Sequence, residues 1–258
     1  MVRSDDLARA VAAAQEAGEI LLSHYQARDR LAVSNKRAGD FVSEADLAAE
    51  AHLRQRLQQE GDGWLGEETA PLDGGRRWVV DPLDGTTNFL RGIPHWCVSV
   101  GLEVAGQPVL GVVHDPLREE TFAAAPGQGL RLNGEAAGVA ETGELASALF
   151  GTGIPFGGMD HIGEHAADIA RLMPHCAGVR RMGAAALDLA WVASGRLDGF
   201  WERRLRPWDI AAGLALLEAS GAVVEGIAPG EKPWQSGTVL TAAPAIFVPL
   251  AALIRNVA

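Results

Sequence analysis

Apolar residues recur at helical spacing through the first sixty residues and then give way to short apolar runs. Residues 5–28 carry alanine, leucine, valine and tyrosine between charged residues at intervals of about three and four, which predicts an amphipathic helix. A second helical stretch begins at Ser43 and is ended by Gly61-Asp62-Gly63. Three later runs, each bounded by glycine, proline or aspartate, predict strands at 78–80, 97–104 and 109–114.

The pattern changes after about residue 140. It predicts strands at 146–151, 198–201, 222–225 and 238–243, and helices at 160–173, 184–194, 209–220 and from about 245. No repeat and no low-complexity linker separates the two halves. We therefore expect one compact layered α/β unit, 1–258, with subdomains of about 1–142 and 143–258 that share an interface.

Composition and charge narrow the function classes. Nearly half of the 258 residues are hydrophobic and 21% are charged, which is typical of a globular protein. The net charge of −11 argues against nucleic acid as the main partner, because binding to a phosphate backbone needs a basic surface. Two cysteines, no signal pattern and no apolar run of 18 residues favour a reducing cytoplasm and exclude a membrane helix.

The string Asp81-Pro82-Leu83-Asp84 places two carboxylates directly after a predicted strand, with a proline that fixes a turn between them. Carboxylate oxygens are the ligands that Mg²⁺ prefers. Gly85-Thr86-Thr87-Asn88 then looks like the start of a helix, whose free N–H groups can hold an anion. The alternative, in which Asp81 ends a strand and Asp84 caps a helix, accounts for one aspartate but not for the whole string. The string favours a metal-assisted phosphatase site.

Two strings carry a resemblance to a known family. WVVDPLDGTTNFLRGIP, from Trp78, resembles the first signature of the inositol monophosphatase family, and Trp208-Asp-Ile-Ala-Ala-Gly213 resembles its second. The resemblance extends from about Lys36 to about Gly221. It implies an α+β protein with the layered αβαβα sandwich shared with fructose-1,6-bisphosphatase, and a Mg²⁺-dependent, lithium-sensitive phosphomonoesterase.

The resemblance also implies a set of site residues. The metal ligands would be Glu67, Asp81, the backbone carbonyl of Leu83, Asp84 and Asp209, with Asp84 bridging two metals. Asp46 would accept a hydrogen bond from the Thr86 hydroxyl, and Thr86 with Glu67 would orient and activate the attacking water. The substrate contacts would be Asp84, Gly85, Thr86, Gly183, Ala185, Glu202 and Asp209. Lys36 and Asp40 would belong to a mobile loop that closes over a third metal.

Several of these residues have a purely structural alternative. Asp46 fits the third position of a capping box that begins at Ser43, and this is compatible with a second contact. Glu67 and Glu68 could form a solvated loop pair. Asp209 could be an acidic residue that the dipole at the start of its helix stabilises.

The substrate side departs from the family pattern. Ala184 stands where the family often has a threonine or serine hydroxyl. The segment 203–206, with Arg203, Arg204 and Arg206, carries more positive charge than an inositol site requires. These arginines could pair with Glu202, meet a second negative group of a bisphosphate or nucleotide, or face solvent. The departures affect the identity of the alcohol and leave the phosphatase chemistry unchanged.

Two further features invite other interpretations. His161-Ile-Gly-Glu-His165 matches the H-x-x-E-H string of some zinc peptidases, but we interpret it as a solvated helix face. Cys97 lies within a predicted strand and is expected to be a buried, inert thiol.

The expected activity is hydrolysis of inositol 1-phosphate by metal-activated water. The resemblance implies two to three Mg²⁺ per site, substitution by Mn²⁺, inhibition by Li⁺ and Ca²⁺, and a homodimer without membrane or nucleic-acid partners. Alternative substrates are fructose 1,6-bisphosphate, 3′-phosphoadenosine 5′-phosphate and histidinol phosphate. A regulatory binding protein on the same fold is the alternative from another class.

Overall fold

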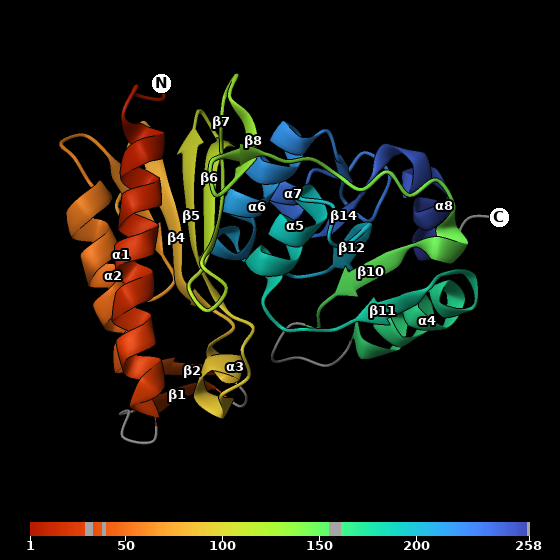
Figure 1. The fold of residues 1–258 in the computed structure, drawn as a ribbon, viewed down its shortest axis with the longest axis horizontal. Coiled ribbons are helices and arrows are strands. Elements are labelled where there is room, and N and C mark those ends of the chain that lie inside the picture. The colour runs from red at the N-terminus through yellow and green to blue at the C-terminus, as the bar shows by residue number, and fades with distance from the viewer. Residues whose placement is uncertain (29–32, 38–39, 155–160, 257–258) are drawn as a thin grey trace.

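Helices and sheets alternate in layers. The computed structural model describes residues 1–28, 33–37, 40–154 and 161–256. Figure 1 shows α1 (Asp6–Gln26) and α2 (Glu44–Leu57) on one face of a seven-stranded sheet. α5 (Ala185–Ala193) and α6 (Pro207–Ser220) lie between this sheet and a five-stranded sheet, and α4 (Ile162–Leu172) and α8 (Pro244–Arg255) lie beyond the second sheet. In the described parts of the chain, no helix combines the length and apolar character needed to cross a membrane.

The seven-stranded sheet follows the chain order. Its strands are β3 (Gly63–Gly66), β4 (Arg76–Asp84), β5 (Cys97–Val104), β6 (Gln107–Asp115), β7 (Glu120–Ala125), β8 (Gly129–Leu132) and β9 (Glu135–Ala136). β3 runs parallel to β4, and the remaining neighbours are antiparallel. Helices cover both faces of its centre, so β4 is buried along nearly its whole length.

The five-stranded sheet has the order β11 (Gly178–Arg180), β10 (Leu149–Thr152), β12 (Gly199–Glu202), β14 (Val239–Ala242) and β13 (Val223–Glu225). β10 is parallel to both of its neighbours, and β14 is antiparallel to both of its own. The remaining elements are the hairpin β1 (Val33–Arg37) and β2 (Asp40–Ser43), the short helices α3 (Thr86–Arg91) and α7 (Pro233–Ser236), and 3-10 turns at Leu145–Ser147 and Met173–His175. The two sheets fall on either side of residue 142, where the division into subdomains stays a prediction.

The long predicted helices and the strands of the second half are confirmed to within a few residues. Two local predictions are wrong. The strand expected from 146 begins at Leu149, because Leu145–Ser147 forms a 3-10 turn. The turn expected at 81–84 is the end of β4 itself. The alternation of apolar residues did not reveal β3, β7, β8, β9 and β11, which are short or contain alanine, glycine and charged residues.

Close packing of α6 on the sheet brings its first turn to the carboxyl end of β4. A side-chain carbon on Gly111 of β6 would lie 2.3 Å from the carbonyl oxygen of Ala212, and one on Gly101 of β5 would lie 2.6 Å from the Cβ of Ala211. Glycine in the strands and alanine in the helix therefore permit a direct backbone approach. This approach places Asp209, at the start of α6, near the acidic end of β4.

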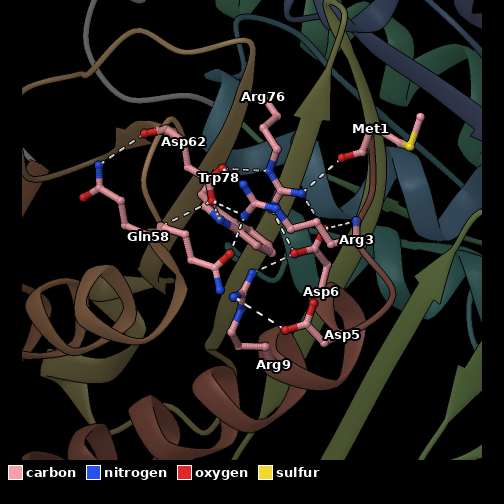
Figure 2. Close-up of polar contacts among 10 residues, drawn as sticks. Met1, Arg3, Asp5, Asp6, Arg9, Gln58, Asp62, Arg76 and Trp78 are labelled. Carbon is pink, nitrogen blue, oxygen red and sulfur yellow. Dashed lines mark hydrogen bonds and ion pairs between the residues drawn. The ribbon is translucent and has the colours of Figure 1, made fainter.

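A buried ion-pair network fixes the start of α1 to the same sheet, and Figure 2 shows it in detail. Arg76 of β4 donates two hydrogen bonds to Asp6, at 2.5 and 2.9 Å, and its Nε lies 3.0 Å from Asp62. Arg3 donates to Asp62, and Arg9 donates to Asp6. Both carboxylates are inaccessible to solvent, so their charges depend on these arginines.

Candidate active site

A bulge in β4 brings Asp81 and Asp84 to one face of the sheet. In a regular strand, side chains three positions apart point to opposite faces. Here Asp81 pairs with Ser99 and Asp84 with Cys97, so three steps along β4 match two along β5. The extra residue lies at Pro82-Leu83, where a proline is tolerated because the ladder is interrupted. The Leu83 N–H donates to Asp81 at 3.0 Å, which tightens the bulge.

Gly85 turns the chain from β4 directly into α3. Its φ is +93°, a conformation that favours glycine, and a Cβ there would lie 3.0 Å from the carbonyl oxygen of His95. The backbone can therefore enter α3 without an intervening loop. The first N–H groups of α3 lie immediately beyond the two aspartates.

Asp46 links α2 to the start of α3. Its Oδ2 accepts from the Ser43 N–H at 2.9 Å and from the Ser43 hydroxyl at 2.6 Å, and its Oδ1 lies 3.2 Å from the Thr86 hydroxyl oxygen. The predicted capping box and the predicted hydrogen bond to Thr86 are therefore both present. The Thr86 hydroxyl also lies 3.0 Å from the carbonyl oxygen of Leu83. Burial raises the pKa of Asp46.

Glu67 lies in the loop after β3 and is half-buried. Its N–H donates to the carbonyl of Val80 at 3.2 Å, which ties the loop to β4. The next residue, Glu68, donates its N–H to the buried carboxylate of Glu50 at 2.8 Å. Glu50 is not among the predicted site residues, although its position four residues after Asp46 on the same helix indicates a shared face.

Asp84 is also joined to the C-terminal half. Its Oδ2 accepts from the Ala186 N–H at 2.7 Å, so it caps the start of α5, and the thiol of Cys97 lies 3.8 Å from the same oxygen. Cys97 is buried as expected, and burial together with Asp84 raises the pKa of its thiol. The structural alternative, in which Asp84 caps a helix, is therefore correct about the role. The helix that it caps is α5, about a hundred residues later, and not the helix that directly follows Asp84.

Two polar groups that the sequence analysis missed support this junction. Asp188 of α5 lies 3.1 Å from His95 Nε2, and both side chains are buried. Asn88 of α3 donates to the carbonyls of His95 and Met182, both at 2.8 Å. Asn88 therefore fixes α3 to the chain just ahead of Gly183, the first of the predicted substrate contacts.

Asp209 and Glu202 approach the same region from the second half of the chain. Asp209 accepts from the Arg206 N–H at 2.6 Å, so it caps α6 as well as facing the other carboxylates. Glu202, at the end of β12, is buried, and a Cβ on Gly153 would lie within 2.4 Å of its carboxylate. Ala185, by contrast, contributes only backbone and a methyl group at the start of α5.

The electrostatics of the site are dominated by burial and mutual repulsion. Burial raises the pKa of Asp81 far above its usual range, and the charges of Glu67, Asp84 and Asp209 raise it further. Burial raises the pKa of Asp84 to about 7, with Asp188 and Glu67 adding to the rise and the Ala186 N–H and His95 opposing it. The pKa of Asp209 is raised in the same way. These carboxylates are therefore close enough to resist simultaneous ionisation.

The donor set fits a hard divalent cation. It consists of carboxylate oxygens from β4, α6 and the loop after β3, and a cation among them would remove the repulsion. Within the described ranges, no three histidine, cysteine, aspartate or glutamate side chains are already gathered as a formed metal site.

Of the arginines near the second signature, Arg203 forms its ion pairs with α4. Arg203 donates to Asp168 and lies 3.6 Å from Glu164, so it is paired with α4 and not with Glu202. Arg204 is exposed, with a φ of +62°. The cation that lowers the pKa of Glu202, against the large rise caused by burial and by Asp209, is Arg181, which lies beside Gly183.

Two remaining predictions concern other segments. Lys36 and Asp40 fall in the backbone of β1 and β2, but their side chains and residues 38–39 between the strands lie outside the described structure. The solvated face predicted at 161–165 is wrong. His161 and His165 are buried, and His165 stacks on Trp201, because this end of α4 packs against the second sheet. Glu164 points instead to Arg203.

Comparisons with known proteins agree with this architecture. The model of the inositol monophosphatase family matches residues 3–257. An inositol-1-monophosphatase of Rhizobium meliloti (strain 1021) is 43% identical over 93% of this chain and 92% of its own. The Nus factor SuhB of Escherichia coli (strain K12) is 37% identical over 96% of this chain and 94% of its own. The crystal structure of extragenic suppressor protein suhB from Bartonella henselae superposes with a TM-score of 0.94, at 35% identity, over 99% of this chain and 100% of that one. The predicted layered fold is confirmed.

Proposed function

This chain belongs to the inositol monophosphatase family, and from that premise we propose that it is a Mg²⁺-dependent phosphomonoesterase whose preferred substrate is inositol 1-phosphate. The family consists of phosphomonoesterases. The observation that carries the proposal is the group of mutually repelling carboxylates, Glu67, Asp81, Asp84 and Asp209, beside the first N–H groups of α3.

We assign the cation to these four carboxylates and to the carbonyl of Leu83. When bound, the cations would lower the pKa of the attacking water, neutralise the phosphate and stabilise the leaving alkoxide. They would also allow an acidic site to bind an anion, because these carboxylates would repel a phosphate monoester until they are neutralised.

The protein's own contribution is orientation. In this proposal Glu67 accepts the proton of the attacking water. Thr86, whose hydroxyl donates to Asp46 at 3.2 Å, accepts a hydrogen bond from the other hydrogen of that water and so orients it. The N–H groups of Gly85 and Thr86 receive the phosphate oxygens. Because the bulge and the glycine fix these donors in advance, little reorganisation is needed during the reaction.

The substrate's alcohol would lie between the halves of the molecule. We propose that Glu202 accepts hydroxyl hydrogens of the alcohol, with Gly183 and Ala185 lining the loop and Asp209 and Asp84 completing the contact. Arg181 adds a positive charge beside Gly183. A polyol and a second phosphate are therefore the two kinds of group that this side could receive.

The test is phosphate release from a panel of monoesters. The panel holds inositol 1-phosphate, glycerol 2-phosphate, fructose 1,6-bisphosphate, 3′-phosphoadenosine 5′-phosphate and histidinol phosphate, each assayed with Mg²⁺, with Mn²⁺, with chelator, and with Mg²⁺ plus Li⁺. We expect Mg²⁺-dependent, lithium-sensitive release that is fastest with inositol 1-phosphate. A different best substrate would refute the assignment of inositol 1-phosphate. If no compound in the panel releases phosphate, the proposal that this protein is a phosphomonoesterase is refuted.

The relatives named Nus factor SuhB favour a second candidate, a regulatory binding role on the same fold. Such a role need not use the carboxylates. Capture of a protein partner equally by wild type and by Asp84→Asn would support it, whereas capture that requires Asp84 would tie the partner to the phosphatase site.

A further inference from the structure

Two buried carboxylates lie one helical turn apart on α2. Residues four apart share a face of a helix, so Asp46 and Glu50 both point toward the sheet. Neither side chain is accessible to solvent. Asp46 reaches Thr86, whereas Glu50 reaches the segment on the other side of the site, residues 64–69.

Glu50 gathers three donors from that segment. Its Oε2 accepts from the Glu68 N–H at 2.8 Å, and its Oε1 accepts from Trp64 Nε1 at 3.3 Å and from the Thr69 hydroxyl. Trp64 Nε1 also lies 3.1 Å from the Thr69 hydroxyl oxygen, which closes the group. The segment passes directly over the carboxylate, because a Cβ on Gly66 would lie 2.0 Å from Oε1.

A buried carboxylate stabilises the fold less than an apolar side chain of the same size would. Burying it costs free energy that these three neutral donors offset only in part, whereas an apolar side chain would pack there without that cost. What the carboxylate adds is direction, since each donor must point at a fixed oxygen. The backbone of Glu67 is thereby held on both sides: its own N–H binds Val80 of β4, and the next N–H binds Glu50 of α2.

We propose that Glu50 is a positioning residue for Glu67, so that α2 sets the spacing between Glu67 and Thr86 through one carboxylate for each. Only the roles of Glu67 and Thr86 in this statement rest on the proposed function. The bracing of the loop by Glu50 can be tested without any activity.

The test compares Glu50→Gln with Asp62→Asn. Glutamine keeps one acceptor oxygen, but its NH₂ group must face either the Glu68 N–H or the Trp64 and Thr69 donors. Asp62 is the control, because it is also buried and lies just before β3, whereas the loop of Glu67 follows β3. It accepts from Trp78 Nε1 at 3.4 Å and pairs with Arg3 and Arg76 (Figure 2). The readouts are Tm, the Mg²⁺ concentration that gives half-maximal phosphate release, and hydrogen exchange of the amides of 67–69 in chelator.

We expect both variants to lower Tm, and only Glu50→Gln to raise the half-saturating Mg²⁺ concentration, by about tenfold to a hundredfold, and to speed exchange of the Glu68 amide. A half-saturating concentration within twofold of wild type would overturn the proposal, because Glu50 would then act on stability alone. If Glu50→Gln does not fold, Thr69→Val removes one donor and should give a smaller rise; no rise overturns the proposal. If wild type releases no phosphate, the proposed function fails, and hydrogen exchange alone decides for Glu50.

Discussion

Replacing Asp84 by asparagine should stabilise the metal-free protein while removing its activity. Asparagine keeps the size of the side chain and an oxygen that can accept from the Ala186 N–H. It removes the charge that burial and the neighbouring acids disfavour. We therefore expect turnover to fall almost to zero and the fold to be retained.

The size of the effect follows from the pKa of Asp84. Its folded pKa of about 7 lies above the ordinary 3.8, so the folded protein holds the proton more tightly. The stability that this provides is fully present below pH 3.8 and is lost progressively as the pH rises from there to about 7. The full loss corresponds to about 4 kcal/mol. A neutral asparagine does not undergo this loss of stability. It also removes the repulsion that the charge of Asp84 exerts on Asp81 and Asp209.

The assay is thermal unfolding with chelator and with Mg²⁺, at pH 5 and pH 8. Each kcal/mol moves Tm by about 2–4 °C in a chain of this size. In chelator, Asp84→Asn should unfold about 8 °C or more above wild type at pH 8. At pH 5, where little more than a third of the loss has occurred, the difference should shrink to about 3–6 °C. Mg²⁺ at a hundredfold excess over Kd should stabilise wild type by about 2.7 kcal/mol and so raise its Tm by about 5–11 °C. It should leave the Tm of the variant nearly unchanged.

Asp115→Asn provides the comparison. Asp115 is also buried, but it accepts from Arg118 and from the N–H of Leu117 outside the site, so its loss should destabilise the protein with or without Mg²⁺. If Asp84→Asn in chelator at pH 8 is no more stable than wild type, the reasoning about repulsion is refuted. If it keeps substantial activity, Asp84 does not bridge the metals.

Three further predictions follow from other contacts. Arg76→Met should lower the free energy of unfolding, measured by chemical denaturation, by about 3 kcal/mol, because it leaves Asp6 and Asp62 buried without their shared cation. Arg77→Met, which breaks a partly exposed pair with Glu103, should lower it by less than about 1 kcal/mol. Equal losses would contradict the network. Phosphate binding, measured by calorimetry, should collapse in excess chelator, and unchanged binding would contradict a metal-dependent site. Arg181→Gln should lower kcat/KM for fructose 1,6-bisphosphate about fivefold more than for inositol 1-phosphate, whereas Arg180→Gln should not; an equal effect on both substrates would remove Arg181 from substrate selection.

The long elements and the residue types of the candidate site can be predicted from the sequence alone. Helical periodicity is repeated over many residues in α1, so that element was predicted closely. The string from Asp81 to Thr86 combines residue types that a strand end does not need, and it indicated a phosphatase site before any geometry was known. The capping box at Ser43 was also legible, because it depends on spacing within one turn.

How these groups are brought together depends on contacts between distant segments of the chain. The bulge that turns Asp81 and Asp84 to one face depends on pairing with β5, and the helix that Asp84 caps is formed by residues about a hundred positions later. The spacing from Asp46 places Glu50 on the same helix face, but its contacts could not be predicted because its partners come from another segment. Helices and their caps depend on residues that are neighbours in the sequence, so they can be predicted from it. The position of a buried carboxylate depends on hydrogen-bond donors from distant segments, which only the packing of the layers brings close.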